Sequence, residues 1–151
     1  MKYTNAMDFL KEYGTLQRSC QIIDEQMFEI ASLLREIKRD ENGNEPENVT
    51  GRINKYVSKL TDDYKHLSLR KRLLTYRINL IESVVKSLPK NERTVIDRFF
   101  LSPDKHYAAE DLMEELEFEK THIYRLRTRA LEMIEEIIEN IPLCEEAYED
   151  T

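Results

Sequence analysis

The chain has 151 residues, of which 35% are charged, and its 23 Lys and Arg against 30 Asp and Glu give a formal net charge of −7. Few glycines and prolines, no tryptophan and many Leu, Ile, Glu, Lys and Arg residues are typical of an all-α protein. No Gly-rich phosphate loop is found, and no apolar run exceeds three residues, which excludes a membrane-spanning helix. The start of the chain has no apolar signal segment, so we expect a cytoplasmic protein.

The first expected element is a long antiparallel helical hairpin over residues 1–88. Apolar residues recur at alternating steps of four and three over residues 9–37 and again over residues 53–88, which is the heptad pattern of a coiled coil. Asn5 or Thr4 suits the N-cap of the first helix. The polar stretch between the two runs contains a glycine and a proline, which predicts a loop near residues 40–51.

One antiparallel register satisfies both apolar runs, because facing residues then have numbers that sum to 94. Phe9 faces Val85 in this register, and Lys71, the single polar residue of the second run, faces Ile23 with Asp24 beside it. A charged residue at such a position fixes the register or the oligomeric state. The alternative is that its long stem lies along the seam and carries the amine to water.

The second helix carries a further apolar face, made of Leu69, Leu73, Tyr76, Leu80 and Val84. A two-helix hairpin needs only one apolar face per helix, so this second face must cover something else. It packs either on the C-terminal domain or on another subunit, and a homodimer through these five residues is our hypothesis.

Residues 89–140 are expected to form a trihelical helix-turn-helix domain, followed by an acidic tail at residues 141–151. Pro89 ends the long helix, and a short helix with Val95, Ile96, Phe99 and Phe100 follows. Apolar spacing then predicts a helix over Ala108–Leu116, three linking residues, and a last helix from about residue 120. Two short helices joined by such a turn, with a third before them, have the helix-turn-helix pattern.

The outward face of the last helix is basic and rich in hydrogen-bonding groups, as contacts with phosphates and base edges require. The best candidates for base contacts are Lys120, Thr121, His122, Tyr124 and Arg125. Candidates for phosphate contacts are Arg127 and Arg129 on the same helix, with Lys105 and His106 before the motif. The alternative interpretation is the solvated basic face of a purely structural helix bundle.

A family resemblance adds to this interpretation. The segment L-P-K-N-E-R-T-V-I-D-R-F-F at residues 88–100 resembles the L-P-x-x-E-R-x-V-(I/L)-x-x-R-(F/Y) opening of region 4 of bacterial sigma factors. The segment I-Y-R-L-R-T-R-A-L at residues 123–131 resembles the end of that region. No part of the chain resembles the promoter-melting region 2 of sigma factors. The chain looks more like the ArpU/RinA-type phage late-gene transcriptional regulators, in which a helical N-terminal part precedes a domain like sigma region 4.

This resemblance, which covers about a third of the chain, implies a DNA-binding regulator of prophage late or packaging genes. It places Lys120, Thr121, Tyr124 and Arg125 at base-contacting positions. Two residues depart from the family pattern. Glu117 stands where the family often has a turn glycine, so the turn needs an unusual backbone or a different geometry. Met113 replaces a small alanine, which alters the angle between the helices.

The net charge is spread unevenly. Residues 65–77 carry five basic residues and no acidic one, and residues 118–131 have a net charge of +3. By contrast, residues 107–117 have a net charge of −5 and residues 132–151 one of −8. The overall negative charge therefore does not exclude double-stranded DNA, but it confines the contact to a small surface.

Three classes of function compete. The first is a transcriptional regulator that reads promoter or operator DNA, with RNA polymerase as a possible further partner. The second is an adaptor that binds RNA polymerase or another host protein without reading DNA. The third, an enzyme, is not expected, because no nucleophile with a general base is visible. Cys20, Cys144 and the three histidines are scattered, so neither a disulfide, a metal site nor a cofactor is expected.

Overall fold

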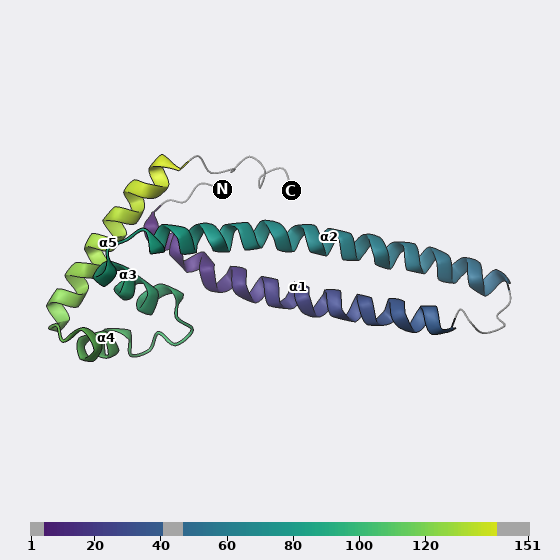
Figure 1. Ribbon diagram of the computed structural model, residues 1–151, viewed down its shortest axis with the longest axis horizontal. Coiled ribbons are helices and arrows are strands. Elements are labelled where there is room, and N and C mark those ends of the chain that lie inside the picture. Colours follow the sequence, from purple (N-terminus) through teal and green to yellow (C-terminus); the bar gives the residue numbers. More distant parts are fainter. Residues whose placement is uncertain (1–4, 41–46, 142–151) are drawn as a thin grey trace. The chain divides into compact units, whose positions relative to one another are not determined.

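The computed structural model describes residues 5–40 and 47–141, and every regular element in these ranges is helical, which confirms the predicted all-α class. The elements are α1 (Ala6–Asp40), α2 (Glu47–Lys86), α3 (Lys90–Ile96), the π-helical segment η1 (Asp97–Leu101), α4 (Ala108–Leu116) and α5 (Lys120–Asn140) (Figure 1). None of the helices in the described ranges is long and apolar enough to cross a membrane.

The ends of the helices are close to those predicted, with one exception. The Oδ1 atom of Asn5 accepts a hydrogen bond from the backbone N–H of Asp8 at 2.9 Å, so Asn5 caps α1 as expected. The other proposed cap, Thr4, lies outside the described residues. α2 begins at Glu47, earlier than the predicted end of the loop at residue 51. Residues 41–46 of that loop and residues 142–151 of the acidic tail also lie outside the described ranges.

The chain divides into two compact units. Within the described residues, 5–15 and 78–141 make the first unit, and 16–40 with 47–77 make the second. The long helices α1 and α2 therefore each contribute to both units. The boundary that the sequence predicted after residue 88 falls inside the first unit.

The second unit consists of α1 and α2 running in opposite directions beside each other (Figure 1). Leu16, Ile23 and Leu60 are buried along their seam. Lys71 Nζ lies 2.5 Å from Asp24 Oδ1, the neighbour that the predicted register gives it. Its hydrogen bond to Asp24 is the main reason that the pKa of Lys71 is raised above its ordinary value. The amine is therefore held by a specific partner at one point of the seam.

In the first unit the start of α1 and the end of α2 also lie together. Phe9 and Val85, which the predicted register places opposite each other, are both buried, and Leu10 is fully buried although it lies off the heptad seam. Tyr13 Oη donates a hydrogen bond of 2.7 Å to Glu82 Oε1 across the two helices. The start of α1 thus buries a wider face than a two-helix seam requires.

The second apolar face of α2 is divided between the two units. Val84 is 3% exposed and Leu80 is half-buried, so this end is covered within the first unit. In the second unit Leu69, Leu73 and Tyr76 are exposed, by 57%, 37% and 52%. The second apolar face of α2 is therefore covered only at its C-terminal end, at Leu80 and Val84.

α3, η1, α4 and α5 pack around a small core in the first unit. Val95 of α3, Leu112 of α4, and Ile123 and Leu126 of α5 are buried against one another. The partly buried hydrophobic side chains around them are Phe99, Met113, Leu116 and Phe118. Because α5 packs on both α3 and α4, its orientation is fixed by the same side chains that bury its inner face.

The turn between α4 and α5 depends on one unusual backbone conformation. Glu117 ends α4 with φ 58° and ψ 37°, and it is the only non-glycine residue with positive φ in the described part of the chain. A left-handed residue at this place closes the helix and turns the chain toward α5. The turn therefore has an unusual backbone: a glutamate adopts the strained left-handed conformation, and the turn is not lengthened.

Replacing Glu117 by glycine is expected to raise the free energy of unfolding by about 0.5–1 kcal/mol. The left-handed conformation costs a residue with a side chain about 1–2 kcal/mol, while glycine costs about 0.5–1 kcal/mol more backbone entropy on folding. Urea unfolding of the two chains measures the difference. The matched control is Glu114→Gly, which removes the same charge from an exposed residue inside α4 and should destabilise by about 1 kcal/mol. Equal effects of the two substitutions would contradict this account of the turn.

Candidate nucleic-acid interface

The side chains of α5 divide into an inner and an outer face. Its buried residues are Ile123, Leu126, Ala130 and Ile134, which follow one another at steps of three and four. Six of the predicted contact residues on this helix are exposed: Lys120, Thr121, His122, Tyr124, Arg125 and Arg129. The inner face anchors the helix, so the outer face is presented on a rigid element.

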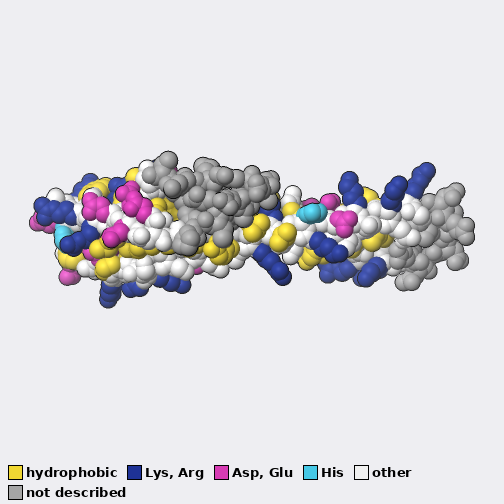
Figure 2. Space-filling view, turned by 90° about the horizontal axis from the view of Figure 1, so that it is seen from above, with side chains coloured by type: hydrophobic (Ala, Val, Ile, Leu, Met, Phe, Trp, Pro, Cys, Tyr) yellow, Lys and Arg dark blue, Asp and Glu magenta, His cyan; other side chains and the backbone are white. Residues whose placement is uncertain are grey.

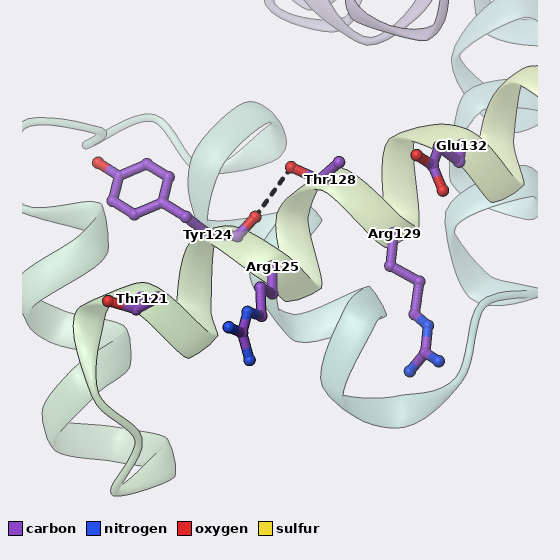
Figure 3. A pocket seen from close by; sticks show the side chains of 6 residues that line it. All are labelled: Thr121, Tyr124, Arg125, Thr128, Arg129 and Glu132. Atoms are coloured by element: carbon purple, nitrogen blue, oxygen red, sulfur yellow. Dashed lines mark hydrogen bonds between the residues drawn. The ribbon is translucent and has the colours of Figure 1, made fainter.

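A shallow, open groove runs along the outer face (Figure 3). The residues that line it are Thr121, Tyr124, Arg125, Thr128, Arg129 and Glu132. Thr128 and Glu132 are not among the contact residues predicted from the sequence, although steps of three and four from Thr121 and Arg125 lead to both. Side chains that end in hydroxyl or guanidinium groups line the first two turns of the groove, and Glu132 lies at its far end.

Tyr124 lies at the edge of this groove and packs its ring against η1. Its ring lies 5.8 Å from the ring of Phe99, centroid to centroid, at an angle of 48°. Its backbone carbonyl accepts a 3.0 Å hydrogen bond from Thr128 Oγ1, the contact drawn in Figure 3. The ring remains 40% exposed. The phenol is therefore packed against the η1 side chain Phe99 on one part of its surface and leaves the rest open to a ligand.

Arg127 differs from the other predicted contact residues. It is half-buried, and its guanidinium carbon lies 5.0 Å from the ring centroid of Phe99, 5.4 Å from that of Phe100 and 6.0 Å from that of Tyr124. Its Nε atom is buried and makes no hydrogen bond with the described residues. Arg127 is thus part of the packing between α5 and η1, in a cation–π arrangement with three rings.

The π-helical segment η1 contributes the two phenylalanines of this arrangement. The backbone N–H of Ser102 donates to the carbonyl of Asp97 at 2.8 Å, a bond that spans five residues, as in a π-helix. A π-turn is wider than an α-turn, so neighbouring side chains diverge less around the helix axis. We attribute to this geometry the approach of both Phe99 and Phe100 to one guanidinium group.

Arg127→Ala is expected to lower the free energy of unfolding by about 1–2 kcal/mol, since it removes a partly desolvated cation–π contact and the packing of the side-chain stem. The matched control is Arg125→Ala, which removes the same charge from an exposed position two residues away and should change stability by less than about 0.5 kcal/mol. Thermal or urea unfolding at neutral pH measures both. Equal losses in the two variants would show that the three-ring contact contributes nothing.

The remaining predicted residues lie in different settings. Arg129 Nη1 is 3.8 Å from Oε1 of Glu92, a buried carboxylate of α3, while the Arg129 side chain itself is 68% exposed. His122 packs edge-on against the ring of Phe118, with centroids 4.5 Å apart. Lys105 is exposed in the segment before α4, as is His106. Arg129 therefore links the outer face of α5 to the core of the first unit.

The surface charge changes sign between α4 and α5. Glu110, Asp111 and Glu114 are exposed on α4, and Glu115 Oε2 accepts a 2.7 Å hydrogen bond from Arg98 Nη2 of η1. The outer face of the first turns of α5 instead carries Lys120 and Arg125. An anionic ligand is favoured at the start of α5 and disfavoured along α4.

The described residues hold no group of three or more His, Cys, Asp or Glu side chains placed to bind a metal ion. Compared with family models, curated proteins and solved structures, the chain matches none of them. The interpretation of the α5 face therefore rests on its own geometry and chemistry.

Proposed function

We propose that this chain is a DNA-binding transcriptional regulator of the phage or prophage type. In this proposal α4 and α5 act as a helix-turn-helix like that of sigma region 4, and the start of α5 enters the major groove to read promoter or operator DNA. The resemblance to ArpU/RinA-type regulators belongs to the same proposal.

The outer face of α5 is the observation that carries the proposal. Lys120, Thr121, Tyr124 and Arg125 are all exposed on it within the first two turns, and the groove along this face is lined by hydroxyl and guanidinium groups. Arginine is the residue most often used to bind guanine by two hydrogen bonds, and hydroxyl groups bond to bases or phosphates. The buried inner face fixes the helix from which these groups project, as a reading surface requires.

A second candidate function is an adaptor that binds RNA polymerase or another protein without reading DNA. The exposed carboxylates of α4, Glu110, Asp111 and Glu114, favour it, because a helix that crosses the DNA backbone with these groups would face phosphates poorly. The two functions differ in one measurable property, which is affinity for duplex DNA.

Fluorescence anisotropy of the full chain with labelled duplex DNA from the regions beside its own gene tests the proposal. If about four phosphates are contacted, the association constant should fall roughly 100-fold between 50 and 200 mM salt. A chain that binds no duplex at the lower salt concentration, yet binds RNA polymerase, would be the adaptor.

Arg125→Ala is expected to weaken binding to the preferred duplex by about 1–3 kcal/mol, the size of one bidentate base contact. Arg93→Ala is the matched control, because it removes the same charge from an exposed residue of α3 that lines a different groove. Equal losses of affinity in the two variants would reject Arg125 as a base-reading residue.

A further inference from the structure

A row of exposed apolar side chains lies on α2 within the second unit. Leu69, Leu73 and Tyr76 are 57%, 37% and 52% exposed and follow one another at steps of four and three, so they share one side of the helix. Lys71, which pairs with Asp24 of α1, lies two residues from both leucines and therefore on the opposite side. We call the three apolar residues the α2 stripe. It faces away from α1.

Basic side chains border the α2 stripe on both sides. At 100° per residue Arg70 falls on one border, and Lys65 and Arg72 fall on the other. All three are exposed, and residues 65–77 contain no acidic residue. Figure 2, which views the molecule from the α2 side, shows yellow hydrophobic and dark blue basic side chains next to each other along this helix. The surface is thus an apolar strip between two cationic edges.

This charge pattern argues against a second copy of the chain as the occupant. In a two-fold symmetric dimer the same patch meets itself, so the basic borders of one stripe would lie against the basic borders of the other. Like charges at such flanking positions destabilise a helix pair. The basic residues that border the stripe therefore argue against the homodimer that the apolar spacing alone predicts.

The apolar centre of the stripe argues against DNA as the occupant. Phosphates bind cations and hydrogen-bond donors, and two leucines and a tyrosine in the middle of the contact would not contribute to that binding. An amphipathic helix uses both parts of the surface, because its apolar row covers the stripe and its charged borders meet the cationic edges.

We propose that the α2 stripe docks an amphipathic helix of another protein whose apolar row is bordered by Asp and Glu residues. The stripe lies in the second unit and the outer face of α5 in the first. The proposal is thus independent of DNA binding and adds a protein partner to the chain.

A peptide selection with the full chain tests this inference. The probe is a displayed library of 20-residue helical peptides with apolar residues at helical spacing and random charged residues at the flanking positions. We expect the selected peptides to carry predominantly Asp and Glu at these positions. The affinity of a synthetic copy should fall at least tenfold between 50 and 300 mM salt, because both charged borders are exposed.

Three variants locate the binding surface. Leu69→Ser should weaken binding of the selected peptide at least tenfold, whereas Ile22→Ser should leave it unchanged, since Ile22 is equally exposed at 56% but lies on α1. Arg70→Glu with Arg72→Glu should abolish binding of the acidic peptide and permit binding of a copy with lysine in place of each acid. Because Leu69 and Ile22 are exposed, circular dichroism should show that both serine variants are folded.

Several results would overturn the proposal. These are enrichment of peptides with neutral or basic borders, no enrichment at all, and binding that is equally affected by Leu69→Ser and Ile22→Ser. Leu69-dependent dimerisation in sedimentation experiments, or Leu69-dependent binding to phosphatidylserine vesicles, without selection of acidic peptides would assign the stripe to a second copy or to a lipid surface instead.

Discussion

Replacing Leu112 by alanine is expected to lower the free energy of unfolding by about 2–5 kcal/mol, the range for removing a fully buried leucine from a core. Leu112 is 0% exposed and packs with Val95, Ile123 and Leu126, so it joins α4 to α3 and α5. The lost side chain leaves a cavity where three helices meet. Urea unfolding followed by circular dichroism measures the loss.

Two control substitutions show that the effect depends on the place and not on the residue type. Leu112→Met conserves volume and should cost less than about 1.5 kcal/mol. Leu69→Ala removes the same atoms from a side chain that is 57% exposed and should change stability by about 0.5 kcal/mol or less. A Leu112→Ala variant as stable as Leu69→Ala would mean that α3, α4 and α5 do not share this core.

The second large effect is a loss of stability at high pH that depends on Tyr13. Burial, reinforced by the hydrogen bond to Glu82 and by the carboxylates of Glu82 and Asp97, raises the pKa of Tyr13 to about 12. Since the unfolded value is about 10, ionisation of the unfolded phenol lowers the free energy of unfolding by about 2–3 kcal/mol in total as the pH rises from 10 through 12. Below pH 10 both states carry the neutral phenol, and this loss is absent.

Comparison of the wild-type chain with Tyr13→Phe isolates this loss. At pH 7.5 the wild type should be more stable by about 1 kcal/mol, because the variant loses the hydrogen bond to Glu82. By pH 11 ionisation in the unfolded state should lower the stability of the wild type alone by about 1–1.5 kcal/mol, which removes or reverses the difference. The same comparison with Tyr76→Phe, at a ring 52% exposed, is the control. A difference for Tyr13→Phe that stays constant from pH 7.5 to 11 would contradict the assignment.

Helical periodicity predicted most of the helix positions. The spacing over residues 108–116 gives α4 with the bounds that the structure shows, and the proline at position 89 marks the start of α3. The heptad register also brings Asp24 beside Lys71. These features depend on the spacing of apolar residues along the chain, which can be read directly from the sequence.

The division into units was not predictable from the same pattern. The heptad pattern runs without a break along both long helices, so it does not show where other elements pack against them. The signal lies off the seam, in Leu10 at the start of α1, which is 0% exposed. A buried residue beside a heptad seam indicates a third neighbour, and here the start of α1 and the end of α2 belong with α3 and α5.

The orientation of Arg127 was also missed, for a chemical reason. It lies at steps of four, three and seven from the buried Ile123, Ala130 and Ile134, so its position is on the inner face. A charged residue at such a position is usually assigned to solvent. It is accommodated here because two adjacent phenylalanines of a π-helical segment cover its guanidinium group, and periodicity does not predict that geometry.

The central claim is that the outer face of α5 reads DNA sequence, and a selection from a random duplex pool tests it most directly. The full wild-type chain should enrich one sequence motif. The Arg125→Ala chain should enrich the same motif with the preference for guanine lost at one position, because the other contacts of the face remain. Enrichment of no motif by the wild type, or of an unchanged motif by Arg125→Ala, would contradict the claim.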